Sequence, residues 1–172
     1  VLIVLLLILT VMVHMRNRKL KSTLEEQMAE RRLLDKICAD FTAVYYVELN
    51  TGSFEILHIN DGTNVKKMNL KQGDNFNSSA DQYAVQYLYE KERQEFKDWI
   101  STGHLKEQLS RKERITYHYR SKPNPNQHEF FEAQAVKIYE DEKHFFALVG
   151  FRHIDDIMEK ETTIQNQLKQ AL

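Results

Sequence analysis

The sequence predicts an α+β fold with a five-stranded antiparallel sheet and helices on one face of it. Two observations lead to this prediction. Segments rich in β-branched and aromatic residues form two groups, at 43–59 and 114–154, with helical patterns between them. The strands also do not alternate singly with helices, as they would in a parallel sheet. The expected order is β-β, helices, β-β-β.

Composition excludes several classes of protein. The 172 residues include 24 Lys and Arg against 25 Asp and Glu, for a net charge of −1. Nucleic-acid-binding domains usually carry a basic excess, so we expect no nucleic-acid partner. The single cysteine, Cys38, excludes an internal disulfide framework and a zinc site built from several cysteines.

The chain opens with an apolar segment, VLIVLLLILTVMV, that contains no charged side chain. As a helix it spans about 20 Å, less than the ~30 Å hydrocarbon core, so further apolar residues are expected upstream. The basic segment HMRNRKLK follows, and such residues favour the cytoplasmic side of a membrane. We predict a membrane helix at 1–15 in a cytoplasmic membrane, with 16–172 cytoplasmic. A signal-peptide core is the alternative, although no small-residue cleavage site follows.

A linker helix is expected over 16–40. Its apolar positions recur near 3.5-residue spacing at Leu20, Leu24, Met28, Leu34 and Cys38. Polar residues interrupt the seam at Gln27 and Arg31, so a coiled coil would be marginal on its own. Both an amphipathic helix packed on its own domain and a dimeric coiled coil fit this pattern.

The first strand group reads as an antiparallel hairpin. Strands are expected at 43–50 and 53–59, joined by a turn at Thr51-Gly52. Turn-forming residues at 60–64 predict a loop. The pattern at 65–79 is ambiguous.

Three helices are expected in the middle of the chain, at 80–89, 92–100 and 104–111. Ser78 or Ser79 could cap the first of them.

The second strand group is expected at 114–120, 128–139 and 144–154. The last strand is apolar on both faces and needs cover on both. The helix that precedes Phe41 could cover the second face.

The hairpin AVYYVELNTGSFEIL, the ending ALVGFRHIDD and the strand order together resemble a PAS domain over roughly residues 41–157. PAS domains commonly end in an Asp-containing strand-to-helix junction, where Asp155-Asp156-Ile157 stands here. The segment YLYEKERQEFKDWISTGHLKEQL resembles the middle of bacterial sensor PAS domains. It departs from their pattern, because Tyr89-Glu90-Lys91-Glu92-Arg93 replaces the usual His-Pro-Asp-Asp-Arg stretch.

The flanking segments resemble those of bacterial membrane-bound sensors, and EKETTIQNQLKQAL resembles the linker of hybrid sensor histidine kinases. The resemblance implies a transmembrane helix at 1–15, a linker helix at 16–40, a PAS-like domain at 41–154 and an outgoing signalling helix at 155–172. It implies a sensor or relay module of a two-component histidine kinase that signals by helix repacking in a homodimer. A diguanylate cyclase output and a ligand-free dimerisation spacer are the alternatives.

The expected signal-transfer junction comprises Ile154, Asp155, Asp156 and Ile157. Either aspartate could cap the outgoing helix and complement its positive end. Because the last strand is followed almost at once by this helix, a shift of the strand would be passed directly to the helix. Ile157, Ile164 and Leu168 could form an apolar stripe that pairs in a dimer.

A small-molecule site would lie between the inner face of the sheet and the helices. Its candidate lining residues are Tyr45, Val47, Phe54, Ile56, Tyr117 and Tyr119, with Trp99 near the rim. Aromatic walls with hydroxyls suit a small planar or acidic ligand, and the same residues suit a closed core.

We expect neither haem nor flavin. His104 is the one histidine in a helical position suited to haem, and it stands at a helix start where exposure is common. Light-sensing flavin chemistry needs a cysteine in the helical segment, and Cys38 precedes the domain. His118 and His128, on neighbouring strands, lack a carboxylate or cysteine partner in the sequence pattern, so no metal site is expected. No catalytic motif occurs, and we expect no catalytic residues in this chain.

Overall fold

The structure, a computed structural model, describes residues 2–60, 74–122 and 129–171. It forms two units, which divide between Ile37 and Cys38. The first unit is a single helix, α1 (Leu2–Ile37), so residues 2–15 and 16–37 of the two predicted segments belong to one continuous helix, which ends before the predicted limit at 40. Within the described residues, no helix is both long enough and apolar enough to cross a membrane.

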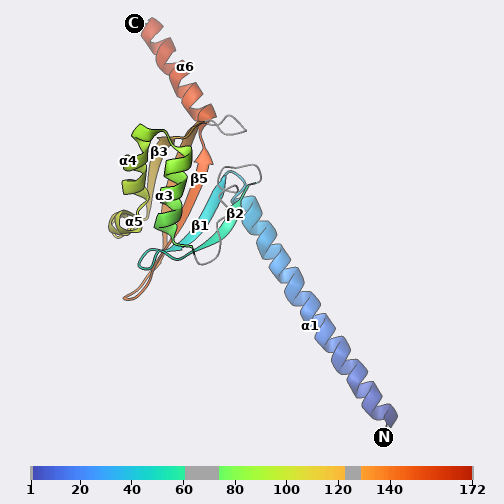
Figure 1. The fold of residues 1–172 in the computed structure, drawn as a ribbon. Helices are drawn as coiled ribbons and strands as arrows, with labels where there is room; N and C mark the ends of the chain where they lie inside the picture. The colour runs from blue at the N-terminus through green and yellow to red at the C-terminus, as the bar shows by residue number, and fades with distance from the viewer. Residues whose placement is uncertain (1, 61–73, 123–128, 172) are drawn as a thin grey trace. The chain divides into compact units, whose positions relative to one another are not determined.

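The second unit contains a five-stranded antiparallel sheet in the part of the chain that is described (Figure 1). Its strand order is β2-β1-β5-β4-β3, with β5 in the centre. This arrangement confirms the predicted α+β fold. The strands are β1 (Ala43–Glu48), β2 (Phe54–Ile59), β3 (Arg114–Arg120), β4 (Phe130–Glu140) and β5 (Phe145–His153).

Between β2 and β3, the described residues form three helices that lie over one face of the sheet, as Figure 1 shows. They are α3 (Phe76–Tyr87), α4 (Glu90–Ile100) and α5 (Thr102–Leu109). Most of the loop predicted at 60–64, and much of the ambiguous segment that follows it, lie outside the described residues.

The predicted cap of the first of these helices was wrong. Asn75 Oδ1 accepts hydrogen bonds from the backbone N–H groups of Asn77 (3.0 Å) and Ser78 (3.3 Å), so α3 begins at Phe76. The Ser79 hydroxyl instead donates to the Asn75 carbonyl. Asn75 also forms an isolated β-bridge with Ser53, which fixes this helix start against the first hairpin.

The core lies between the sheet and the helical layer. Alternate side chains of β5 point into it, and Phe145, Ala147 and Val149 are at most 1% exposed. On the helical side, Phe96 and Leu105 are equally buried. Full burial of a side chain of this size contributes about 1.5–3 kcal/mol, so this layer supplies much of the stability of the domain.

The opposite face of β5 is covered at Gly150 by Phe41. A Cβ atom at Gly150 would lie 2.7 Å from the Phe41 ring, so the absence of a side chain is what admits the ring. The helix that precedes Phe41 was the predicted cover for this face; at Gly150 the cover is the ring of Phe41 itself. Further along this face, Tyr46 stacks on Phe146 with ring centroids 5.0 Å apart.

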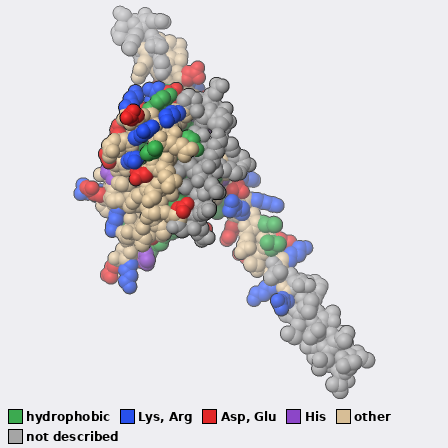
Figure 2. Space-filling model, viewed as in Figure 1, with side chains coloured by type: hydrophobic (Ala, Val, Ile, Leu, Met, Phe, Trp, Pro, Cys, Tyr) green, Lys and Arg blue, Asp and Glu red, His purple; other side chains and the backbone are tan. Residues whose placement is uncertain are grey.

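Basic and acidic side chains are interspersed over the face of the molecule that Figure 2 presents. One ion pair joins α3 to α4, since Lys97 Nζ lies 3.2 Å from Asp81 Oδ1.

Candidate functional site

The strand-to-helix junction contains no flexible connection. The central strand ends at His153, and α6 (Asp155–Ala171) begins after a single intervening residue. That residue, Ile154, is 3% exposed, and its carbonyl accepts hydrogen bonds from the backbone N–H groups of Ile157 and Met158 at 3.0 Å. The first turn of the helix is thus built on a residue anchored in the core.

Asp155 ties the helix start to the neighbouring strand. Its Oδ1 accepts hydrogen bonds from the backbone N–H groups of Glu129 (2.9 Å) and Phe130 (3.1 Å), where β4 begins. Ile154 N–H also donates to the Phe130 carbonyl at 2.9 Å. Strand pairing stops here, because the chain is helical from Asp155 onward. The Asp155 side chain takes the place of a backbone carbonyl as the acceptor for the N–H groups at the start of β4.

The helix-capping role predicted for Asp155 or Asp156 stays a prediction, and the hydrogen bonds described above join Asp155 to the start of β4. The Asp155 carboxylate is directed to β4, and Asp156 is exposed on the first turn of α6. Both carboxylates still stand in the first helical turn, where negative charge is favourable.

The seven residues predicted to line a ligand site all belong to the core or its edge. Tyr45, Val47 and Tyr119 are at most 4% exposed. The others are partly buried and pack against the same core cluster: Phe54, Ile56, Trp99 and Tyr117.

Aromatic side chains meet closely among these residues. The Tyr45 ring lies edge-on to Phe54 at 5.7 Å and to Phe151 at 6.0 Å between centroids. A second row begins with Trp99, stacked on Tyr117 at 5.4 Å, and continues to Tyr119 at 6.3 Å. These distances are typical of packed aromatic pairs.

The tyrosine hydroxyls in this core remain protonated at neutral pH. Tyr83 and Tyr119 place their hydroxyls 3.4 Å apart. Burial raises the pKa of Tyr83 to about 12, although the hydrogen bond with Tyr119 opposes this shift. Burial also raises the pKa of Tyr117 to about 12, assisted by Glu95 and Glu92. The core thus presents neutral hydroxyls to any group that enters it.

The histidines considered as ligands have different surroundings. His104 is partly buried on α5, where its backbone N–H donates to Ser101 Oγ at 3.3 Å. His118 Nε2 lies 3.0 Å from Glu132 Oε2, a carboxylate partner that the sequence analysis missed. His128 lies outside the described residues. The side chains that the structure describes form no group of three or more residues able to hold a metal ion.

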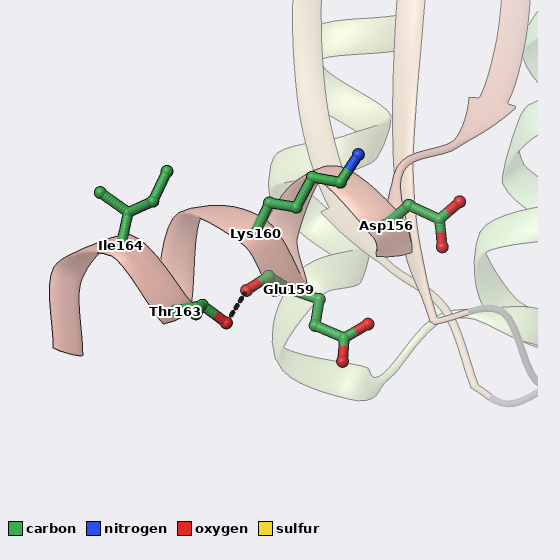
Figure 3. A pocket seen from close by; sticks show the side chains of 5 residues that line it. All are labelled: Asp156, Glu159, Lys160, Thr163 and Ile164. Atoms are coloured by element: carbon green, nitrogen blue, oxygen red, sulfur yellow. Dashed lines mark hydrogen bonds between the residues drawn. The ribbon is translucent and has the colours of Figure 1, made fainter. Parts of the chain in front are cut away.

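The surface of α6 carries a shallow hollow, shown in Figure 3. All of its described lining residues come from this one helix: Asp156, Glu159, Lys160, Thr163 and Ile164. Thr163 is committed to its own helix, because its hydroxyl donates to the Glu159 carbonyl at 2.9 Å. A surface formed by one helix encloses no ligand, so we regard this hollow as part of the exposed helix face.

Two residues beside the junction were missed by the sequence analysis. Arg120, at the end of β3, donates from Nε to Glu129 Oε1 at 3.1 Å, and its guanidinium makes a second contact with the same oxygen. The alternation in RITYHYR placed Arg120 on the outer face, but its partner depends on the pairing register. The sequence does contain a signal for this ion pair, because Arg120 and Glu129 carry opposite charges on either side of the connection between β3 and β4.

No protein family matches the sequence, and no curated protein matches it. Solved structures of PAS domains are similar to it in fold. One is the PAS domain of BvgS from Bordetella pertussis, with 11% identity over 86% of this chain and 99% of that one, at a TM-score of 0.45. A PAS domain from Colwellia psychrerythraea shows 16% identity over 72% of this chain and 98% of that one, at 0.39.

A PAS domain from a two-component sensor histidine kinase shows 19% identity over 77% of this chain and 99% of that one, at a TM-score of 0.37. At these identities the likeness concerns the fold alone. In the residues that the structure describes, the order of strands in the sheet and the helices between β2 and β3 give a PAS-like α+β architecture.

Proposed function

We propose that this chain is a PAS-type sensor or relay module of a membrane-anchored two-component histidine kinase. Two copies associate through their flanking helices, and a signal shifts the balance between two packings of those helices. A change of a few kcal/mol in that balance changes the populations by orders of magnitude. The module makes and breaks no covalent bond.

The junction between β5 and α6 is the observation that carries this proposal. Ile154 is the only residue between strand and helix, and Asp155 bonds the helix start to β4. A displacement of the end of β5 or the start of β4 is therefore transmitted to α6 without passing through a flexible segment.

Exposed apolar side chains support pairing of the helices. On α6, Ile157 and Ile164 are 48% and 55% exposed and stand one heptad apart. On α1, Leu24 and Met28 are about half exposed. Exposed apolar stripes on helices gain stability when a second helix covers them.

Membrane attachment is part of the same proposal. It rests on the uncharged segment at 1–13 and on the basic residues that follow it. Fractionation of cells that express the parent protein tests this part, since recovery in the soluble fraction without detergent would contradict it.

The kinase proposal is tested by autophosphorylation of the full-length parent protein in membrane vesicles. We expect Asp155→Ala to change the basal rate at least about fivefold, the lower range of coupling between sites. Glu159→Ala, which removes an exposed carboxylate one turn further along α6 and outside the junction, should leave the rate within about twofold. Equal rates in wild type and Asp155→Ala would contradict the role of the junction, and absence of phosphohistidine in all three would contradict the kinase output.

Dimer formation is tested by native mass spectrometry of the chain in detergent micelles. Ile164→Glu places a charge in the exposed apolar stripe and should shift the protein toward monomer. Gln165→Glu adds the same charge at the next, exposed position and serves as the matched control. A dimer fraction that is unchanged by Ile164→Glu would remove α6 from the interface.

A ligand-free relay is a second candidate, favoured by the ring contacts around Tyr45 and Trp99. The same mass spectra decide this point. A small molecule retained by the wild type would support sensing, and a bare mass would support a relay that responds to its flanking helices.

A further inference from the structure

The α3–α4 corner, residues Tyr87–Tyr89, is bonded to the far end of β3. Leu88 forms an isolated antiparallel bridge with Ser121, and both are fully buried. Lys122 N–H donates to the Tyr87 carbonyl at 2.7 Å. Backbone pairing therefore fixes this corner of the helical layer to the sheet at one place.

Arg120 lies between this corner and the junction. Its guanidinium lies 5.5 Å from the centroid of the Tyr89 ring and 5.4 Å from that of the Phe130 ring. The same guanidinium bonds the Glu129 carboxylate, and Ser121 N–H donates to the Glu129 carbonyl at 2.9 Å. A guanidinium over an aromatic ring is attracted electrostatically, so the two rings favour the placement of Arg120 beside Glu129.

Glu129 and Phe130 are also the two residues whose backbone N–H groups bond Asp155. The start of β4 and the residue before it are thus bonded both by Arg120 and by Asp155, the first residue of α6. We propose that the α3–α4 corner is coupled to the start of α6 through Arg120 and Glu129, so that movement of the helical layer changes the hold of Asp155 on β4. Its signalling meaning rests on the proposed function, whereas the coupling itself is a property of this domain.

Hydrogen exchange of the whole chain in detergent micelles tests the coupling. In Arg120→Gln we expect the amides of Ile157 and Met158 to exchange at least about fivefold faster than in wild type, while the Val149 amide of the central strand keeps its rate. Arg114→Gln is the matched control. It lies on the same face of β3 and is exposed, and it should leave all these rates unchanged.

Reciprocity supplies an independent test. In Asp155→Ala the Lys122 amide, which bonds the Tyr87 carbonyl, should exchange faster by a similar factor. If Arg120→Gln fails to fold, Tyr89→Leu takes its place and should accelerate the same α6 amides.

Unchanged α6 amides in a folded Arg120 or Tyr89 variant would overturn the coupling. So would an equal acceleration at Val149, because that result means only global destabilisation. If the coupling holds while Asp155→Ala leaves autophosphorylation unchanged, the coupling stands and the proposed signalling role fails.

Discussion

At each end of the central strand β5, a carboxylate accepts hydrogen bonds from backbone N–H groups, but the two carboxylates join different parts of the fold. Before β5, Glu48 Oε1 accepts from Phe145 N–H at 3.1 Å, and Glu48 Oε2 accepts from Thr51 N–H at 2.7 Å. After β5, Asp155 accepts two backbone N–H groups of β4. Each carboxylate thus accepts hydrogen bonds from backbone N–H groups at a place where strand pairing ends.

The two carboxylates differ in burial and in what they join. Glu48 is 6% exposed and joins one turn of the sheet to its central strand. Asp155 is partly buried and joins the sheet to a helix that leaves it. Because an unsatisfied group costs more where it is buried, we expect the buried Glu48 carboxylate to contribute more to stability than the partly buried Asp155 carboxylate. The predictions below test that distinction.

Glu48→Ala should have the largest effect. It leaves the Phe145 N–H buried without its acceptor, and an unsatisfied buried group costs about 1–3 kcal/mol. With the loss of the Thr51 bond, we expect a total loss of about 2–4 kcal/mol in the free energy of unfolding. Urea denaturation followed by circular dichroism measures it. Glu55→Ala, at an exposed position of β2, should stay within about 0.5 kcal/mol, and equal effects of both variants would refute the assigned role.

The pH dependence of stability should single out Glu48. Burial acts to raise the pKa of Glu48, but hydrogen bonds from Thr51, Phe145 and Asn50 outweigh it and hold the pKa below its ordinary value. The folded-state pKa is therefore depressed, so the stabilisation is present above the ordinary pKa of 4.5 and is lost as the pH falls through the folded value. Glu48→Gln should have a lower free energy of unfolding than wild type at neutral pH. This difference should become smaller below about pH 4.5, where Glu48 of the wild type loses its stabilising charge. A constant deficit from pH 7 to pH 3 would argue against this linkage.

Asp155→Ala should have the smallest effect on folding. Water can reach the freed N–H groups at this edge, so we expect a loss of about 1 kcal/mol or less in the free energy of unfolding. The same denaturation experiment measures it, with Asp156→Ala as the reference. A loss as large as that of Glu48→Ala would mean that the junction is a stability element, and the proposed distinction between the two ends would fail.

The order of strands and helices along the chain, the alternation of β3 and the position of the junction could all be predicted from the sequence. Each depends on local periodicity, as in RITYHYR, or on an abrupt change of period, as after Phe151. Three features could not. The Asn75 cap stands in a segment without clear periodicity, and the partners of Asp155 and Arg120 depend on the register of strands distant in the sequence. Register is set by tertiary packing, which a local pattern does not encode.

The stacking of Trp99 on Tyr117 has a practical consequence. Trp99 is the single tryptophan of the chain, and it lies on α4 in ring contact with β3. Its intrinsic fluorescence therefore originates at one known point between the helical layer and the sheet. A displacement of α4 would alter the emission without any attached dye, which makes the unmodified protein its own optical gauge of that movement.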